Sequence, residues 1–87
     1  MDKCVKVPCN IGDIAYVNFS IRGSYLREKD RPYPVKIIFI GLNDSVEMGG
    51  GYVNFEYVQG GHQFQLNFSD FGLEIFTSKE EAEDAML

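Results

Sequence analysis

The sequence predicts a mainly β fold, a small five-stranded SH3-like barrel with a short C-terminal α-helix. Three observations predict it. Short segments with strand-type patterns are separated by turn residues, and the last of them precedes a helix cap. The first connection is the longest, and the tightest precedes the fourth strand, an order typical of SH3-like barrels. Closure of the sheet also limits the exposed edges of a small all-β chain.

Length and composition indicate one folded domain over residues 1–87. Hydrophobic residues make up 45% of the chain and include seven Phe and five Tyr, so a chain of this size has enough apolar mass for a core. Charged residues make up 24%, close to the share in ordinary globular domains.

The first half of the chain predicts two strands and a long connection. Residues 14–21 alternate, with Ala15, Val17, Phe19 and Ile21 on one face, which is typical of a half-buried strand. Residues 22–34 lose this pattern and are crowded with charges, so they predict a long charged loop. Residues 35–42 are rich in β-branched side chains and predict a strand buried on both faces.

The second half contains a hairpin signal. Gly60-Gly61 lies between two alternating runs and predicts a two-residue turn. That turn would pair Tyr57 with Phe64, Phe55 with Leu66, and Val53 with Phe68, which leaves one face of the hairpin wholly apolar.

The C-terminal part predicts a short link, a strand and a helix. Residues 69–72 resemble a 3₁₀ link, and residues 73–76 form the last predicted strand. Ser78 with Glu81, or Thr77 with Glu80, has the spacing of a capping box, and the pattern predicts a helix over 78–86. Ala82, Ala85 and Met86 share one stripe of this helix, so we expect it to cap an open end of the barrel.

The two ends of the chain carry a resemblance. Residues 7–16 read Val-Pro-Cys-Asn-Ile-Gly-Asp-Ile-Ala-Tyr, and residues 70–83 read Asp-Phe-Gly-Leu-Glu-Ile-Phe-Thr-Ser-Lys-Glu-Glu-Ala-Glu. Both stretches resemble a group of short uncharacterised proteins encoded in bacterial prophages and mobile elements. Such proteins typically open with Cys-x-x-Gly-Asp-x-x-Tyr and close with Asp-hydrophobic-Gly, a hydrophobic strand and Thr-x-Glu-Glu-Ala-Glu. The resemblance implies an accessory protein of a phage or mobile element and brings no mechanism with it.

Catalytic and metal-binding residues are sparse. Cys4, Cys9 and His62 would need a carboxylate such as Asp13 to complete a zinc site, so we expect ordinary thiols, one of them in the core, and no metal. His62 is the single imidazole and lies at the tip of the predicted hairpin, where no thiol is expected beside it. We therefore expect no catalytic residues, no cofactor and no enzymatic activity.

The charge and the hydropathy of the chain limit the classes of partner that it is expected to bind. The net charge is −5, and seven basic residues face four acidic ones within 1–36, whereas one faces nine within 37–87. An acidic domain repels phosphate backbones, so nucleic acid is a disfavoured partner. No apolar run is long enough for a membrane span, and no secretion signal is evident, so we expect a cytoplasmic protein.

The charged loop is the predicted binding surface. Tyr25 and Tyr33 lie among Arg27 and Arg31, a composition typical of interface hot spots, and Phe71 in the 3₁₀ link is expected to join them. We therefore predict a noncatalytic protein-binding module with an unknown partner. The other interpretation of the loop is that the tyrosines pack on the barrel and the charges solvate it. A nucleic-acid-binding small barrel and a homo-oligomeric structural module are the alternative functions.

Overall fold

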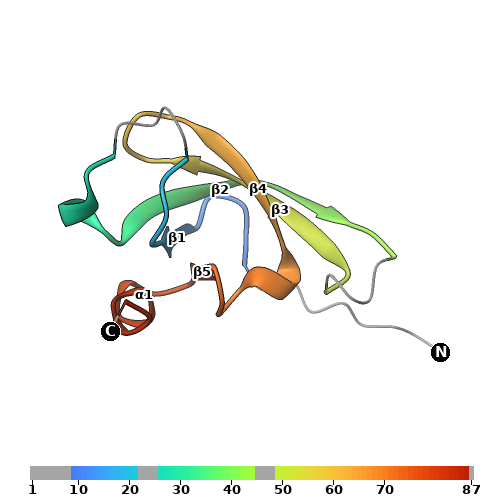
Figure 1. The fold of residues 1–87 in the computed structure, drawn as a ribbon. Coiled ribbons are helices and arrows are strands. Elements are labelled where there is room, and N and C mark those ends of the chain that lie inside the picture. The colour runs from blue at the N-terminus through green and yellow to red at the C-terminus, as the bar shows by residue number, and fades with distance from the viewer. Residues whose placement is uncertain (1–8, 22–25, 45–48, 87) are drawn as a thin grey trace.

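The structure is a computed structural model that describes residues 9–21, 26–44 and 49–86. In these ranges the chain forms, in order, β1 (Ile14–Val17), η1 (Glu28–Asp30), β2 (Tyr33–Leu42), β3 (Gly51–Tyr57), β4 (Gln63–Asn67), η2 (Phe68–Asp70), β5 (Ile75–Phe76) and α1 (Lys79–Asp84). The strands form one antiparallel sheet in the order β4-β3-β2-β1-β5, which curls into a half-barrel (Figure 1). The predicted mainly β class, with five strands and a C-terminal helix, is confirmed.

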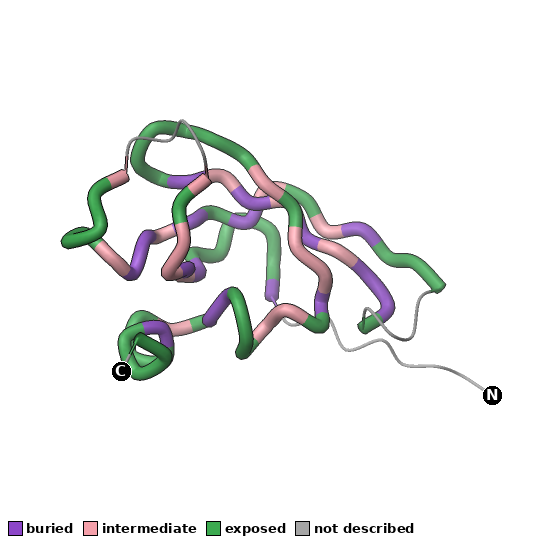
Figure 2. The backbone as a smooth tube through the Cα atoms, in the orientation of Figure 1, coloured by how far each residue is buried: buried purple, intermediate pink, exposed green. Residues whose placement is uncertain are grey.

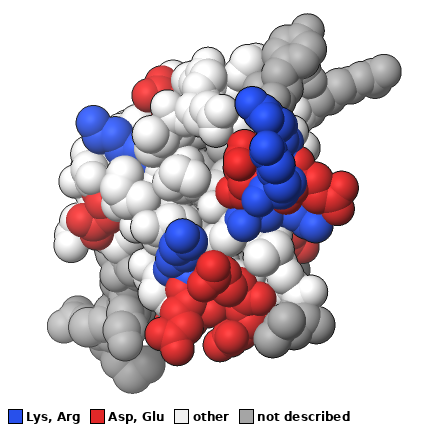
Figure 3. Space-filling view, turned by 90° about the vertical axis from the view of Figure 1, so that its left-hand side faces the viewer, with Lys and Arg blue, Asp and Glu red and all other residues white. Residues whose placement is uncertain are grey.

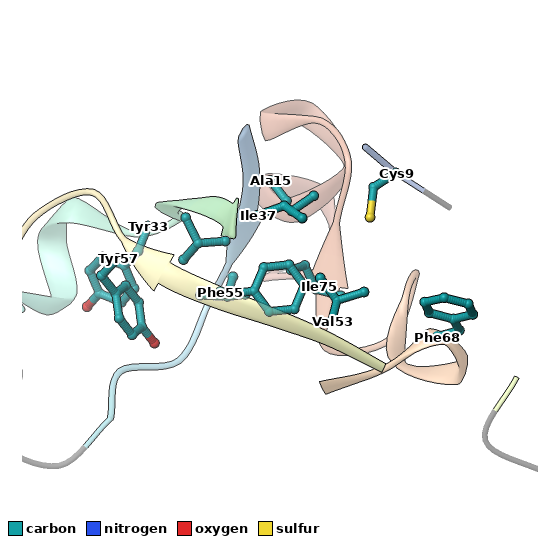
Figure 4. Packing of buried hydrophobic residues seen from close by; sticks show 11 residues of the cluster. Cys9, Ala15, Tyr33, Ile37, Val53, Phe55, Tyr57, Phe68 and Ile75 are labelled. Carbon is teal, nitrogen blue, oxygen red and sulfur yellow. The ribbon is translucent and has the colours of Figure 1, made fainter. Parts of the chain in front are cut away.

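The core fills the concave side of this sheet. Figure 2 shows buried positions alternating with more exposed ones along the strands, and β3 buries every second residue. Phe55 lies at the centre, and its ring stacks on that of Phe64 in β4 with 5.1 Å between the centroids. Figure 4 shows how the core side chains converge from different strands. The largest side chains that are less than 2% exposed are Tyr57, Phe55, Ile37, Ile75, Val17, Val35 and Val53.

Strand β2 pairs with β1 on one side and β3 on the other. The prediction that it is buried on both faces is wrong: Lys36 is exposed, and Phe39 is 47% exposed. In the described part of the chain the core lies on the concave face of the single sheet, and outward side chains of β2 such as Lys36 and Phe39 are exposed. An irregularity in the register between Ile37 and Phe39 interrupts the alternation in the middle of the strand.

The β3–β4 hairpin differs from the prediction by two residues. Phe55 pairs with Phe64 and Val53 with Leu66, and the main-chain nitrogen of Tyr57 donates to the oxygen of His62 at 2.8 Å. The loop therefore spans 58–62, and both glycines adopt positive φ within it rather than forming a two-residue turn. Since the shift is even, each side chain keeps its predicted face.

Phe68 packs in the core although the longer β3–β4 loop removes its predicted pairing with Val53. It does not pair with Val53 but begins η2, where its ring lies over the main chain of Gly51. A Cβ atom on Gly51 would lie only 2.6 Å from that ring, so glycine is required for this close approach. The predicted 3₁₀ link is confirmed, one residue earlier than expected, and Asn67 and Asp70 form its capping box.

Strands β1 and β5 are shorter than predicted. After Val17 the chain leaves the sheet, and Phe19 packs edge-on against Phe64 with 5.3 Å between the ring centroids. Leu73 and Glu74 belong to a turn that follows η2, so β5 begins at Ile75. The sheet thus ends in a two-residue edge strand.

Helix α1 begins as predicted, because Ser78 Oγ accepts a hydrogen bond from the main-chain nitrogen of Glu81 at 3.1 Å. The helix lies against β1 and β5 (Figure 1). Of its predicted apolar stripe only Ala82 is buried, whereas Ala85 and Met86 are exposed. No helix in the described ranges is long and apolar enough to cross a membrane.

Replacement of Phe55 by Ala is predicted to destabilise the domain strongly. Phe55 is fully buried, and removal of a buried Phe ring costs about 3–5 kcal/mol, which is most of the stability of a small domain. Urea unfolding followed by far-UV circular dichroism measures this loss. Val58→Ala is the control, because Val58 is 58% exposed in the hairpin loop. Equal stability of the two variants would contradict the packing described above.

Candidate binding site

Two buried tyrosines hold the chain segments that form the candidate site. The rings of Tyr33 and Tyr57 meet edge to face, with 6.2 Å between their centroids (Figure 4). The Tyr57 hydroxyl donates to the main-chain oxygen of Phe19 at 2.7 Å, and the Tyr33 hydroxyl donates to that of Arg27 at 2.8 Å. Each hydroxyl therefore fixes one segment of main chain that lies outside the regular strands.

A groove of about 500 Å³ lies between these two segments, and we call it the loop groove. One wall contains Asn18, Phe19 and Ser20, and the other contains Leu26, Glu28 and Arg31. Tyr33 also lines the groove. Among the residues that the structure describes, the groove thus combines aromatic and aliphatic surface with the cation of Arg31 and the carboxylate of Glu28.

Arg31 connects the two walls. Its Nη2 atom lies 2.9 Å from Glu28 Oε1, and its Nη1 atom donates to the main-chain oxygen of Asn18 at 3.4 Å. Its Nε atom is shielded from solvent and has no acceptor among the described residues. The Arg31 guanidinium is thus paired with Glu28, whose side chain is largely exposed.

A second groove, of about 220 Å³, lies beside the first and is called the helix groove. It is lined by Leu73, Glu74, Phe76 and Ala85, and it shares Asn18 and Phe19 with the loop groove. The two grooves therefore meet at these shared residues.

Asn18, which lines both grooves, is hydrogen-bonded to helix α1. Its Nδ2 atom donates to the main-chain oxygen of Ala82 at 2.7 Å. A carbonyl oxygen only accepts, so the amide nitrogen of Asn18 must face Ala82, and Oδ1 faces the other way. That oxygen is shielded from solvent and has no donor among the described residues.

The structure brings together part of the predicted binding surface. Arg31 and Tyr33 both line the loop groove. Tyr33 is only 3% exposed, so its ring is part of the core and does not project as an anchor. Arg27 is exposed on the same loop and contributes its main-chain oxygen to Tyr33, and Tyr25 lies outside the described residues.

Phe71 lies apart from the loop groove. Its ring packs 6.2 Å from that of Phe55, and the residue is half-buried against the core. The described lining of the loop groove includes no residue of η2. Phe71, which was expected to join the charged loop in one groove, is not among the described residues that line the loop groove.

The wall formed by Asn18, Phe19 and Ser20 was not predicted from the sequence. Their alternating polarity matched a strand that continued to residue 21, although the strand ends at Val17. No Gly or Pro marks that end in the sequence. The exit from the sheet depends on the bond from Tyr57 to Phe19 O, a contact between residues far apart in the chain.

The candidate zinc ligands do not gather in the described part of the chain. Cys9 is a buried free thiol, as expected for one cysteine, and Cys4 lies outside the described residues. Burial, with a further effect of the Asp13 carboxylate, raises the pKa of Cys9 to about 11. His62 is exposed in the hairpin loop, and no group of three or more His, Cys, Asp or Glu side chains occurs within the described ranges.

Comparisons of the chain with protein-family models, with curated proteins and with solved structures found no match.

Stability at alkaline pH is predicted to depend on Tyr57. Burial, assisted by Tyr33, raises the pKa of Tyr57 from 10.0 to about 12. The unfolded chain loses this proton first, so the free energy of unfolding should fall as the pH rises from about 10 to about 12. Urea titrations at a series of pH values measure the fall.

The Tyr57→Phe variant is the comparison for this prediction. It keeps the ring but leaves Phe19 O without its donor, so we expect a loss of about 1 kcal/mol near neutral pH. The further decline at alkaline pH should be shallower than in the wild type. Identical slopes for the two proteins would show that Tyr57 does not carry the pH dependence.

Cys9 is predicted to react slowly with Ellman's reagent in the folded protein. In a Cys4→Ser background at pH 8, a thiol with a pKa of about 11 is ionised to about 0.1%, against roughly 20% for an ordinary thiol. We expect a reaction at least about a hundredfold slower than in urea, since burial also restricts access. Equal rates in the folded and the unfolded protein would contradict the buried position of Cys9.

Proposed function

We propose that the protein is a noncatalytic protein-binding module that holds an extended segment of a partner in the loop groove. The observation that carries this proposal is the groove itself, in which aromatic surface and an Arg31–Glu28 pair lie side by side. Aromatic side chains beside arginine are enriched where proteins bind one another. Both walls are fixed to the core by tyrosine hydroxyls, so little ordering is required when a partner binds.

We further propose that the half-barrel is of the SH3-like type. The sheet order β4-β3-β2-β1-β5, the long connection between β1 and β2, and the 3₁₀ turn between β4 and β5 support this assignment. Small barrels of this type bind extended peptides in surface grooves lined by aromatic residues. The loop groove lies along the β1–β2 connection, which agrees with such a mode of binding.

The resemblance to short proteins of prophages and mobile elements adds a biological setting to the proposal. In that setting the protein acts in the bacterial cytoplasm as an accessory factor, and its partner is another protein of the host or of the element. The Asp70-Phe71-Gly72 stretch that supports the resemblance lies at η2, outside the described lining of the loop groove. The resemblance therefore supports the phage or mobile-element setting, whereas the groove supports the proposed protein-binding function.

Selection from a displayed library of random twelve-residue peptides tests this function. We expect the immobilised protein to enrich peptides, and Ser20→Trp to weaken their binding at least about tenfold because the new ring fills the groove. Ser20 is exposed, so this change spares the core. Gln65→Trp, at an exposed position of β4, is the control and should bind normally. The proposal fails if no peptide is enriched or if binding survives Ser20→Trp.

A further inference from the structure

We propose that the partner segment continues into the helix groove, and that it is a basic segment with one large apolar side chain. This inference rests on the proposed function and specifies its ligand. The two grooves share Asn18 and Phe19, so an extended chain that leaves the loop groove past these residues enters the helix groove. An extended chain advances about 3.3 Å per residue, so a few residues suffice for the crossing.

The helix groove offers an apolar site for an anchoring side chain. Leu73 is 75% exposed, an unusual position for a large aliphatic residue that lies beside a hollow. Phe19 and Phe76 also line this groove. A single apolar side chain bound there would cover Leu73, as the central anchors of interfaces do.

The charge around the helix groove favours a cation. Glu74 lines the groove, and α1 beside it exposes four carboxylates and one lysine: Glu80, Glu81, Glu83 and Asp84, with Lys79. Figure 3 views this side of the molecule and shows acidic side chains gathered in one group, near a mixed group of basic and acidic ones. The surface that α1 presents beside the helix groove is therefore acidic, whereas the β1–β2 connection exposes Arg27 and Lys29 together with Glu28 and Asp30.

The same charge argues against the other occupants. Nucleic acid brings a phosphate backbone, which the carboxylates of α1 repel, and a second copy of the chain is disfavoured by its net charge of −5, although its residues 1–36 are basic. A segment rich in Lys or Arg is attracted, and its attraction should weaken as salt screens the carboxylates. The charge beside the helix groove therefore favours a basic protein segment as the ligand.

The peptides selected in the library experiment test the inference. We expect them to carry several Lys or Arg residues and one large apolar residue, and to bind less tightly at 300 mM than at 50 mM NaCl in fluorescence anisotropy. Leu73→Ser should weaken binding about tenfold by loss of the apolar contact. The double variant Glu80→Gln/Glu83→Gln should weaken it about threefold and reduce the salt dependence. Glu56→Gln, on the outer face of the sheet, is the control and should change neither.

The outcomes separate the inference from the function on which it rests. Enriched peptides that are neutral or acidic overturn the inference, as does binding that is unchanged by both Leu73→Ser and the double variant. If Ser20→Trp still blocks the binding of neutral or acidic peptides, the proposed function stands but the inference about a basic segment fails. If no peptide is enriched, both proposals fail.

Discussion

The candidate site depends on two buried hydroxyl groups. Tyr33 and Tyr57 pack together in the core, and each donates to a main-chain carbonyl on one side of the loop groove. A buried hydroxyl must find a partner, and here the partners are segments that no strand pairing holds. The aromatic core therefore determines where the irregular chain runs, and the groove is the space left between the two fixed segments.

The elements that depend on local chemistry could be predicted from the sequence. The Ser78 cap and the 3₁₀ link each depend on side chains only three residues apart, and both occur as expected. The apolar face of the hairpin also follows from simple alternation. The register of the hairpin does not follow from alternation. The ring of Phe55 stacks on Phe64, and Phe68 lies over Gly51 instead of pairing with Val53, and both contacts depend on the packed core.

The site was less predictable than the fold, for a physical reason. The sequence pointed to Arg31 and Tyr33 because charged and aromatic residues crowd together between the first two predicted strands, although Tyr33 is the first residue of β2. The burial of Tyr33 and the separation of Phe71 from the groove depend on distant contacts that composition does not encode. Asn18 acquires its place from its bond to Ala82 O, between residues at opposite ends of the chain.

The two-residue strand β5 has a consequence for the order of folding. Pairing of Tyr16 with Phe76 joins positions about 60 residues apart, whereas the β3–β4 hairpin closes a loop of five residues. Local contacts form at a lower entropic cost, so the hairpin should assemble early and the β5–α1 edge last. An edge held by so few main-chain bonds is also the part that opens most readily in the native state. The helix groove belongs to this edge, so it exists only once the rest of the domain has folded.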